Sequence, residues 1–235
     1  MNVIRWLTAA AHWSGENGIP ARVSEHVQLS LAAMAIALLI GLPVGIIVGH
    51  TRRGSATAVT IANLGRSVPS FAVLVLAFIA FLRYAPPKLA FGFGPTVVAL
   101  ALLAIPPIVT NTVVAIEGVD PDAVDAARGM GMGGARVLRS LELPLAAPLI
   151  VTGVRIAAVQ VVATATLAAL IAGGGLGRYI VDGFASGDQV QASAGAVLVA
   201  SFAIGSELLL GAVARLVAPR TASRGDWVAG TQPAR

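Results

Sequence analysis

The chain has 235 residues, of which 57% are hydrophobic and 11% are charged, and its mean hydropathy is +0.85. A soluble domain is about 25% charged, and a soluble fold with this composition would have too little polar surface, so we predict an integral membrane protein. The net charge of +5 does not indicate a nucleic-acid partner, because the basic residues occupy short stretches between apolar runs rather than one patch.

Residues 1–27 precede the first long apolar run. Their own apolar stretch is short and is broken by Arg5 and His12, which is not typical of a secretory signal. Because tryptophan is enriched at membrane–water interfaces, we predict an extracytoplasmic interfacial helix with Trp6 and Trp13 at the headgroups.

Five apolar runs follow, each with about the 20 residues that cross a bilayer as a helix. They lie at 28–49, 57–82, 89–116, 147–172 and 190–217. These runs predict an all-α polytopic membrane protein with five transmembrane helices over 28–217, and a cytoplasmic tail over 218–235 that could be disordered. Because five is odd, the two termini should lie on opposite sides of the membrane.

The basic residues of the loops predict the orientation. If the N-terminus lies outside, nine arginines fall in cytoplasmic segments and five basic residues fall outside, as the positive-inside rule expects. The cytoplasmic set is Arg52, Arg53, Arg128, Arg136, Arg139, Arg215, Arg220, Arg224 and Arg235, against Arg5, Arg22, Arg83, Lys88 and Arg178 outside. We therefore predict an outer N-terminus and a cytoplasmic C-terminus, with Tyr84 and Tyr179 near the outer interface.

Prolines and glycines interrupt the apolar runs. Such breaks are tolerated in lipid where neighbouring helices or water satisfy the freed backbone groups. Two interpretations stay open, namely kinks between packed helices or hinges in helices that rock. The residues concerned are Gly41, Pro43, Pro69, Pro106, Pro107 and Gly153.

The loop at 117–146 is too polar to enter the membrane. Pro121 and Asp122 predict a helix start, and four glycines between 129 and 134 predict a tight turn. Residues 135–143 predict a second short helix that Pro144 ends. The loop is therefore a helix–turn–helix at the cytoplasmic face, either an amphipathic segment resting on the membrane or a docking element for a cytoplasmic partner.

Polar residues also fall within the spans. Arg66 and Arg155 lie within about two turns of the cytoplasmic interface, so we expect their side chains to extend to the headgroups. Glu207 is deeper, and it could pair with Arg155, line a pathway or reach the interface. Uncharged polar residues could bond neighbouring helices or line a pathway; these are Asn63, Thr110, Asn111, Gln160, Thr164 and Thr166.

The outer segment at 172–188 is rich in glycine and is predicted to be a tight loop between the last two spans. The three histidines lack the spacing of metal ligands, and we expect each to be solvated. The sequence has no phosphate-binding loop and no hydrolase motif, and it contains no cysteine. We therefore predict a non-catalytic chain that binds no metal or cofactor of its own.

The loop at 117–146 resembles the EAA loop of permease subunits in binding-protein-dependent ABC importers. In that family Glu-Ala-Ala is followed by three residues, a glycine, nine residues and Ile-x-Leu-Pro. Here Asp125-Ala126-Ala127 is followed after three residues by Gly131, and Leu141-Glu142-Leu143-Pro144 comes nine residues later. Asp for Glu and Leu for Ile are the two departures.

The resemblance covers residues from about 25 to 217. It is strongest to the osmoprotectant permeases, which import glycine betaine, choline, carnitine or proline betaine. The stretches "LELPLAAPLIVTGVRIA" and "ATATLAALIAGGGLGRYIVDGF" carry it. Methionine importers share the Gly-Leu-Gly element, so a permease for an amino acid such as methionine is an alternative. An ion-coupled secondary transporter is disfavoured. Such transporters usually have several intramembrane acids and internal repeats, whereas this chain has a single intramembrane acid and no repeat.

The resemblance implies a MetI-like transmembrane domain in the bacterial inner membrane, with a cytoplasmic coupling helix between the third and fourth spans. The implied partners are two ATPase subunits that bind ATP and Mg²⁺, a second copy of the permease or a paralogue, and an extracytoplasmic substrate-binding protein. The implied ATPase contacts are Asp125, Ala126, Ala127, Arg128, Gly131, Leu141, Leu143 and Pro144. Candidates for the pathway or its outer gate are Glu207, Asn111, Gln160, Thr164, Gly175 and Gly177.

Overall fold

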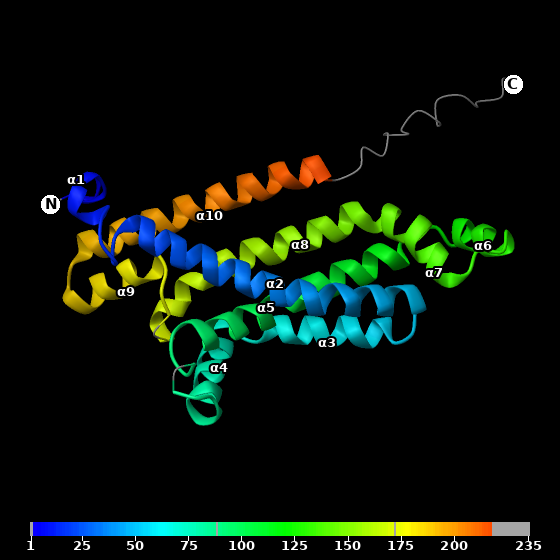
Figure 1. Cartoon of the computed structure of the whole chain (residues 1–235), viewed down its shortest axis with the longest axis horizontal. Helices are drawn as coiled ribbons and strands as arrows, with labels where there is room; N and C mark the ends of the chain where they lie inside the picture. Colours follow the sequence, from blue (N-terminus) through cyan, green and yellow to red (C-terminus); the bar gives the residue numbers. More distant parts are fainter. Residues whose placement is uncertain (1, 88, 172, 218–235) are drawn as a thin grey trace, which may run out of the picture.

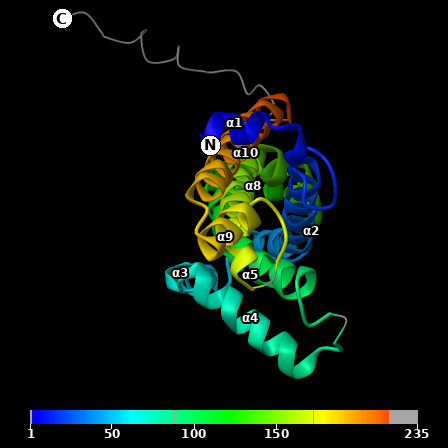
Figure 2. The same cartoon turned by 90° about the vertical axis from the view of Figure 1, so that its left-hand side faces the viewer.

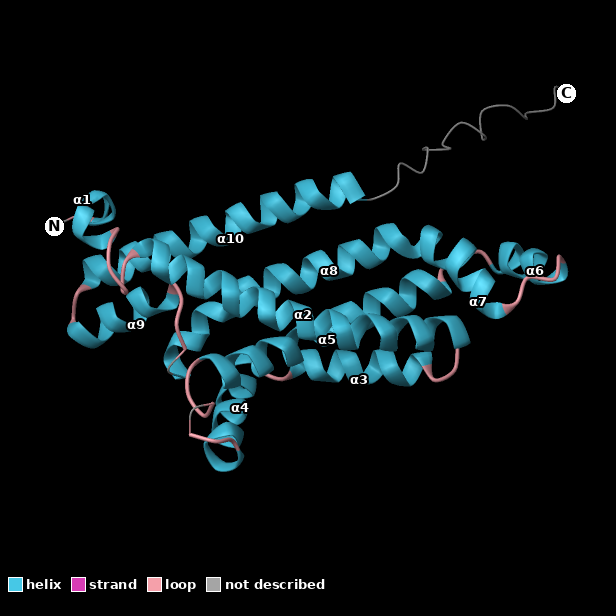
Figure 3. Cartoon of the chain, viewed as in Figure 1, coloured by secondary structure: helices cyan, strands magenta, loops and turns pink. Residues whose placement is uncertain are grey.

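The computed structural model describes residues 2–87, 89–171 and 173–217, and every regular element in these ranges is a helix (Figure 3). Four helical runs are long and apolar enough to cross a membrane: α2 (Ile19–Thr51), α5 (Phe93–Glu117), Gly134–Ile171, which contains α8 (Leu143–Ala165), and α10 (Gln189–Val217). The bent pair α3 (Ser55–Ser67) and α4 (Ser70–Tyr84) is a fifth candidate. The predicted all-α membrane architecture is confirmed, with four or five candidate spans; the predicted tail at 218–235 lies outside the described residues.

The core lies where α2, α5 and α8 contact one another (Figures 1 and 2). Its buried residues include many alanines, which let the three backbones approach closely. They are Leu29, Ala33, Met34, Ala37, Val97, Leu100, Ala101, Ala104, Ile108, Ala157, Ala158, Val161 and Ala165. The helices α3 and α4 pack on α5, and α10 packs on α8 and on α9 (Gly177–Ser186), so α2, α5 and α8 form the centre.

Three glycines, spaced four residues apart, form the face of α2 that contacts α5. A Cβ atom added to Gly45 would come within 2.6 Å of the Cβ atom of Thr112, and one added to Gly41 or Gly49 would come within 3.0 Å of an isoleucine on α5. Small residues at this spacing let membrane helices approach closely. Gly41, which the sequence left open as a kink or a hinge, therefore has a packing role, and Pro43 lies inside the unbroken α2.

The second predicted span, at 57–82, is a bent pair of helices rather than one helix. The structure divides it into α3 and α4, which meet at an angle of 90°. Pro69 lies at the break, and Val68 before it is extended, because the proline ring disfavours helical geometry in the preceding residue. In contrast, Pro106 and Pro107 lie inside the continuous helix α5.

The N-terminal segment forms α1 (Val3–Thr8) and the short 3₁₀ helix η1 (Ala10–His12). The expected helix is present, but the expectation of a headgroup position for Trp6 is wrong. Trp6 is buried, stacks on His12 at 3.8 Å between ring centroids, and meets the edge of Tyr179 at 5.3 Å. Packing against α10 and α9 removes this indole from the surface, whereas Trp13 is exposed.

The two ends of the bundle carry different elements (Figure 1). One end holds α1, the start of α2 and α9, and the other holds α6 (Pro121–Gly129) and α7 (Gly134–Val137). The prediction of a tight loop at 172–188 is wrong for most of its length, because α9 lies there. Tyr179 and Gly183, one helical turn apart, are buried on the side of α9 that faces α10, and this burial stabilises the short helix.

Candidate coupling site and transport pathway

The helix α6 begins at a well-formed N-terminal cap. Pro121 occupies the first turn, where its missing N–H is not needed, and the Asp120 carboxylate accepts a hydrogen bond of 3.0 Å from the Asp122 backbone N–H. Asp122 adds negative charge to the first turn, which the helix dipole favours. The predicted start of this helix is therefore confirmed.

Gly131 reverses the chain after α6. Its φ is +85°, its N–H donates to the Arg128 carbonyl at 2.9 Å, and the Met132 N–H donates to the Ala127 carbonyl at 3.1 Å. This pair of bonds is the Schellman arrangement, which requires a left-handed residue at the position of Gly131. Gly131 therefore makes the turn that the glycines predicted. An added Cβ would touch no neighbouring atom, but a residue with a side chain would be strained at this positive φ.

A small core holds the loop at 117–146, the candidate coupling loop, against the ends of α2, α5 and α8. Val124, Ala127 and Val137 are buried in it, with Leu141 and Leu143 packed at its edge. The remaining predicted contact residues are exposed at the bundle end, namely Asp125, Ala126, Arg128, Gly131 and Pro144. The loop therefore presents a polar, small-residue surface on one side and a packed apolar side on the other.

The prediction that Pro144 ends a short helix is wrong. α7 continues through one π-helical turn, η2 (Leu138–Glu142), into α8, and Pro144 lies in the first turn of α8. In this turn the Leu143 N–H donates to the Leu138 carbonyl, five residues back. The wider turn accommodates a proline that has no N–H to donate.

A buried acid that sequence analysis missed fixes the loop to α2. The Glu142 carboxylate, which is almost fully buried, lies 2.5 Å from Nδ1 of His50 near the end of α2. No sequence signal joins the two residues. Two of the three histidines are not solvated as expected: His50 has this partner, and His26 is buried with Nε2 at 2.9 Å from the Val162 carbonyl.

At the end of the bundle opposite α6, neighbouring atoms lie so close to the backbone of the segment at 172–188 that its glycines are required. An added Cβ at Gly177 would lie 2.1 Å from the Thr166 carbonyl oxygen, and one at Gly175 would lie 3.1 Å from Nδ1 of His26. The Gly175 N–H donates to the Glu25 carboxylate at 2.8 Å, so this segment is fixed to α2. These two candidate gate residues therefore lie together in a packed crossing.

Tyr179 adds a second connection between the outer segment and the N-terminal region. Its hydroxyl donates to the Asn17 carbonyl at 2.6 Å. Burial raises the pKa of this phenol, with the nearby Glu25 carboxylate acting in the same direction against the Arg22 guanidinium. The hydroxyl therefore keeps its proton and remains a donor at neutral pH.

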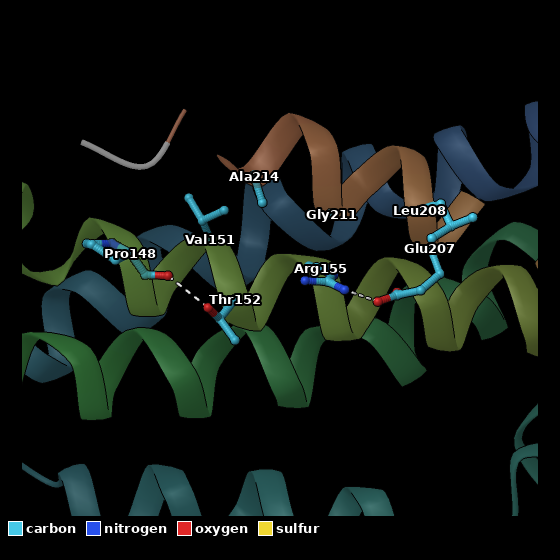
Figure 4. A pocket seen from close by; sticks show the side chains of 8 residues that line it. All are labelled: Pro148, Val151, Thr152, Arg155, Glu207, Leu208, Gly211 and Ala214. Atoms are coloured by element: carbon cyan, nitrogen blue, oxygen red, sulfur yellow. Dashed lines mark hydrogen bonds and ion pairs between the residues drawn. The ribbon is translucent and has the colours of Figure 1, made fainter. Parts of the chain in front are cut away.

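The Arg155 guanidinium pairs with the Glu207 carboxylate across α8 and α10 (Figure 4). The expectation that Arg155 simply extends to the headgroups is therefore wrong, and of the three roles open for Glu207 the pairing is confirmed. Arg66 is exposed on α3.

The uncharged pathway candidates are not gathered with this pair. The Asn111 side chain donates to the Pro107 carbonyl of its own helix at 2.8 Å and lies against Gly153, which brings α5 and α8 close together. Gln160 and Thr164 are partly buried on α8. Among the described residues, no cluster of histidine and acidic side chains could hold a metal ion.

Comparison with known proteins shows the family. Residues 41–223 match the model of the binding-protein-dependent transport system inner membrane component. The chain belongs to this family of transporter permeases. The permease is 35% identical over 195 residues to the choline transport system permease protein OpuBB of Bacillus subtilis (strain 168), covering 83% of this chain and 86% of that protein.

Further relatives of the permease are similar over comparable lengths. It is 33% identical to the glycine betaine/carnitine/choline transport system permease protein OpuCB of the same organism, with 85% and 88% of the two chains covered. It is 36% identical to the osmoprotectant import permease protein OsmY of Salmonella typhimurium (strain LT2), with 83% and 80% covered. Its fold matches an inward-facing MetNI methionine ABC transporter, with a TM-score of 0.73, 22% identity, and 84% of this chain and 95% of that chain covered.

Proposed function

We propose that this chain is the permease subunit of an ABC importer for a small zwitterionic or quaternary-ammonium osmoprotectant, such as glycine betaine, choline, carnitine or proline betaine. The similarity to three permeases named for such solutes, each along at least 80% of both chains, carries the proposal. The likeness to the methionine transporter, at 22% identity, supports the fold and not the substrate.

A separate ATPase would drive this transport by docking on the coupling loop. The exposed Asp125, Ala126 and Arg128 on α6 offer a small polar surface at one end of the bundle, where the loop core leaves them free of the helices behind it. The partner would bind ATP and Mg²⁺, since this sequence has no phosphate-binding loop. A second permease copy or a paralogue would complete the pathway, and an extracytoplasmic binding protein would deliver the solute.

Uptake of labelled solutes tests the substrate class. Cells with and without this chain should differ in uptake of at least one of glycine betaine, choline, carnitine or proline betaine, and the difference should vanish when the ATP-binding lysine of the partner ATPase is replaced. A difference confined to methionine would contradict the osmoprotectant assignment. Uptake that survives loss of the ATPase and stops when the proton gradient is collapsed would instead support an ion-coupled transporter.

A further inference from the structure

The Arg155–Glu207 ion pair is partly exposed on two helices, α8 and α10, that are each long and apolar enough to cross a membrane. Arg155 lies within the helical run Gly134–Ile171 and Glu207 within α10, each about 15 Å or more from the ends of its helix at 1.5 Å per residue. The two side chains are nevertheless 41% and 38% exposed. Charged side chains inside a membrane face a bundle interior or a water-filled cavity, because hydrocarbon cannot solvate them. This face of α8 and α10 therefore lines a polar space.

Two hollows share the side chains of this pair and Thr152, and Figure 4 shows the residues that line one of them. The hollow toward the coupling loop has a volume of about 450 Å³, and the other has about 420 Å³. Volumes of this order hold small molecules. A Cβ atom added to Gly211 would lie 3.3 Å from the Arg155 guanidinium, so the absence of a side chain there gives the guanidinium its room.

We propose that Arg155 and Glu207 form a transient site for a zwitterionic solute in the transport pathway, an inference that rests on the proposed function. The planar guanidinium can donate two parallel hydrogen bonds to the carboxylate of a betaine. A quaternary ammonium group has no N–H to donate, and the Glu207 carboxylate would attract it by charge alone. When the site is empty, the two side chains neutralise each other, which avoids an unpaired charge in the membrane.

A single thiol beside the pair tests this site directly. The chain has no cysteine, so Thr152→Cys gives each copy of this chain in the assembled transporter a single thiol, which lines both hollows. We expect a membrane-impermeant thiol reagent to label it, and glycine betaine to slow the labelling several-fold. Choline, which lacks the carboxylate, should slow it less, and sucrose at equal osmolarity should not slow it. Leu39→Cys on the apolar surface of α2, where Leu39 is 75% exposed, provides the background rate.

A neutral double variant separates binding from folding. In the Thr152→Cys background, Arg155→Gln with Glu207→Gln leaves neither charge unpaired, so the protein should insert and be labelled as before. Protection by glycine betaine should be lost. Labelling at the Leu39→Cys rate, labelling that glycine betaine does not slow, or protection that persists in the double variant would each overturn the site.

Measuring solute uptake in the same cells shows whether a negative result concerns the Arg155–Glu207 site or the proposed function. If cells with the wild-type chain import glycine betaine but the solute does not slow labelling, the site is wrong and the proposed function stands. If these cells import none of the osmoprotectants, the proposed function fails and the site fails with it.

Discussion

Gly131 determines the shape of the candidate coupling loop, because it supplies the left-handed residue that ends α6 in a Schellman turn. Gly133, two residues later, has a φ of −67° and caps α7. An added Cβ meets no atom within 4 Å at either position. The two glycines therefore differ in backbone conformation and not in available space.

Replacing each glycine by threonine isolates that difference. Gly131→Thr places a β-branched residue at positive φ, at a cost of about 1–2 kcal/mol, and should distort the surface offered by α6. We expect normal membrane insertion but a several-fold loss of ATPase co-purification and of uptake. Gly133→Thr should behave like the wild type, since threonine is as good a cap as glycine. Equal loss in both variants would show that this turn is not what the partner requires.

The sequence suggested which residues of the loop contact a partner, which stays a prediction, but it did not show the contacts that hold the loop in place. The pattern of small, polar and apolar residues from Asp125 to Pro144 is local, so its resemblance to the family's loop could be seen in the sequence. The Glu142–His50 contact joins residues 92 positions apart. It depends on how α8 is rotated relative to α2, which no local pattern records.

At the scale of elements, the contact between α2 and α5 depends on the three glycines of α2. Their spacing puts them on one face, where Ile108, Thr112 and Ile116 of α5 fill the space that side chains would occupy. The sequence showed the glycines, but it could not show which helix they face. The sequence likewise could not show which proline bends the chain. Pro69 lies at a 90° bend, whereas Pro43 lies in an unbroken helix.

Alanine at Gly45 tests this packing. The new methyl group would lie 2.6 Å from the Cβ atom of Thr112, and overpacking of this kind costs about 1–3 kcal/mol. We expect a lower midpoint of thermal unfolding in detergent. Gly65→Ala on α3 is the matched control, because its methyl group would meet only Pro106, at 3.6 Å. That variant should be unchanged or more stable by up to about 1 kcal/mol, since alanine favours a helix; an equal midpoint for both would contradict close packing at Gly45.

At the scale of the whole molecule, the two ends of the bundle carry different elements, and which end faces the cytoplasm stays a prediction. α1 and α9 lie at one end and α6 at the other, and α10 runs from the α9 end toward the α6 end (Figure 1). If α3 and α4 together return the chain across the membrane, five crossings separate the termini.

Reporter fusions test this topology. A fluorescent protein joined after Arg235 should be bright, because it would fold in the cytoplasm, and alkaline phosphatase inserted after Gly187, at the end of α9, should be active outside. Active phosphatase at the C-terminus would reverse the orientation. Phosphatase activity at both termini, with none after Gly187, would show that α3 and α4 do not cross together.

The sequence by itself determined the membrane class, the apolar runs, the polar loop at 117–146 and its turn, because hydrophobicity, glycine and proline act on neighbouring residues. The tertiary structure decided which residues meet: Arg155 with Glu207, Glu142 with His50, and the glycines of α2 with α5. These contacts follow from the rotation and close approach of helices distant in the chain, and those are set by the packing of the whole bundle rather than by any one segment.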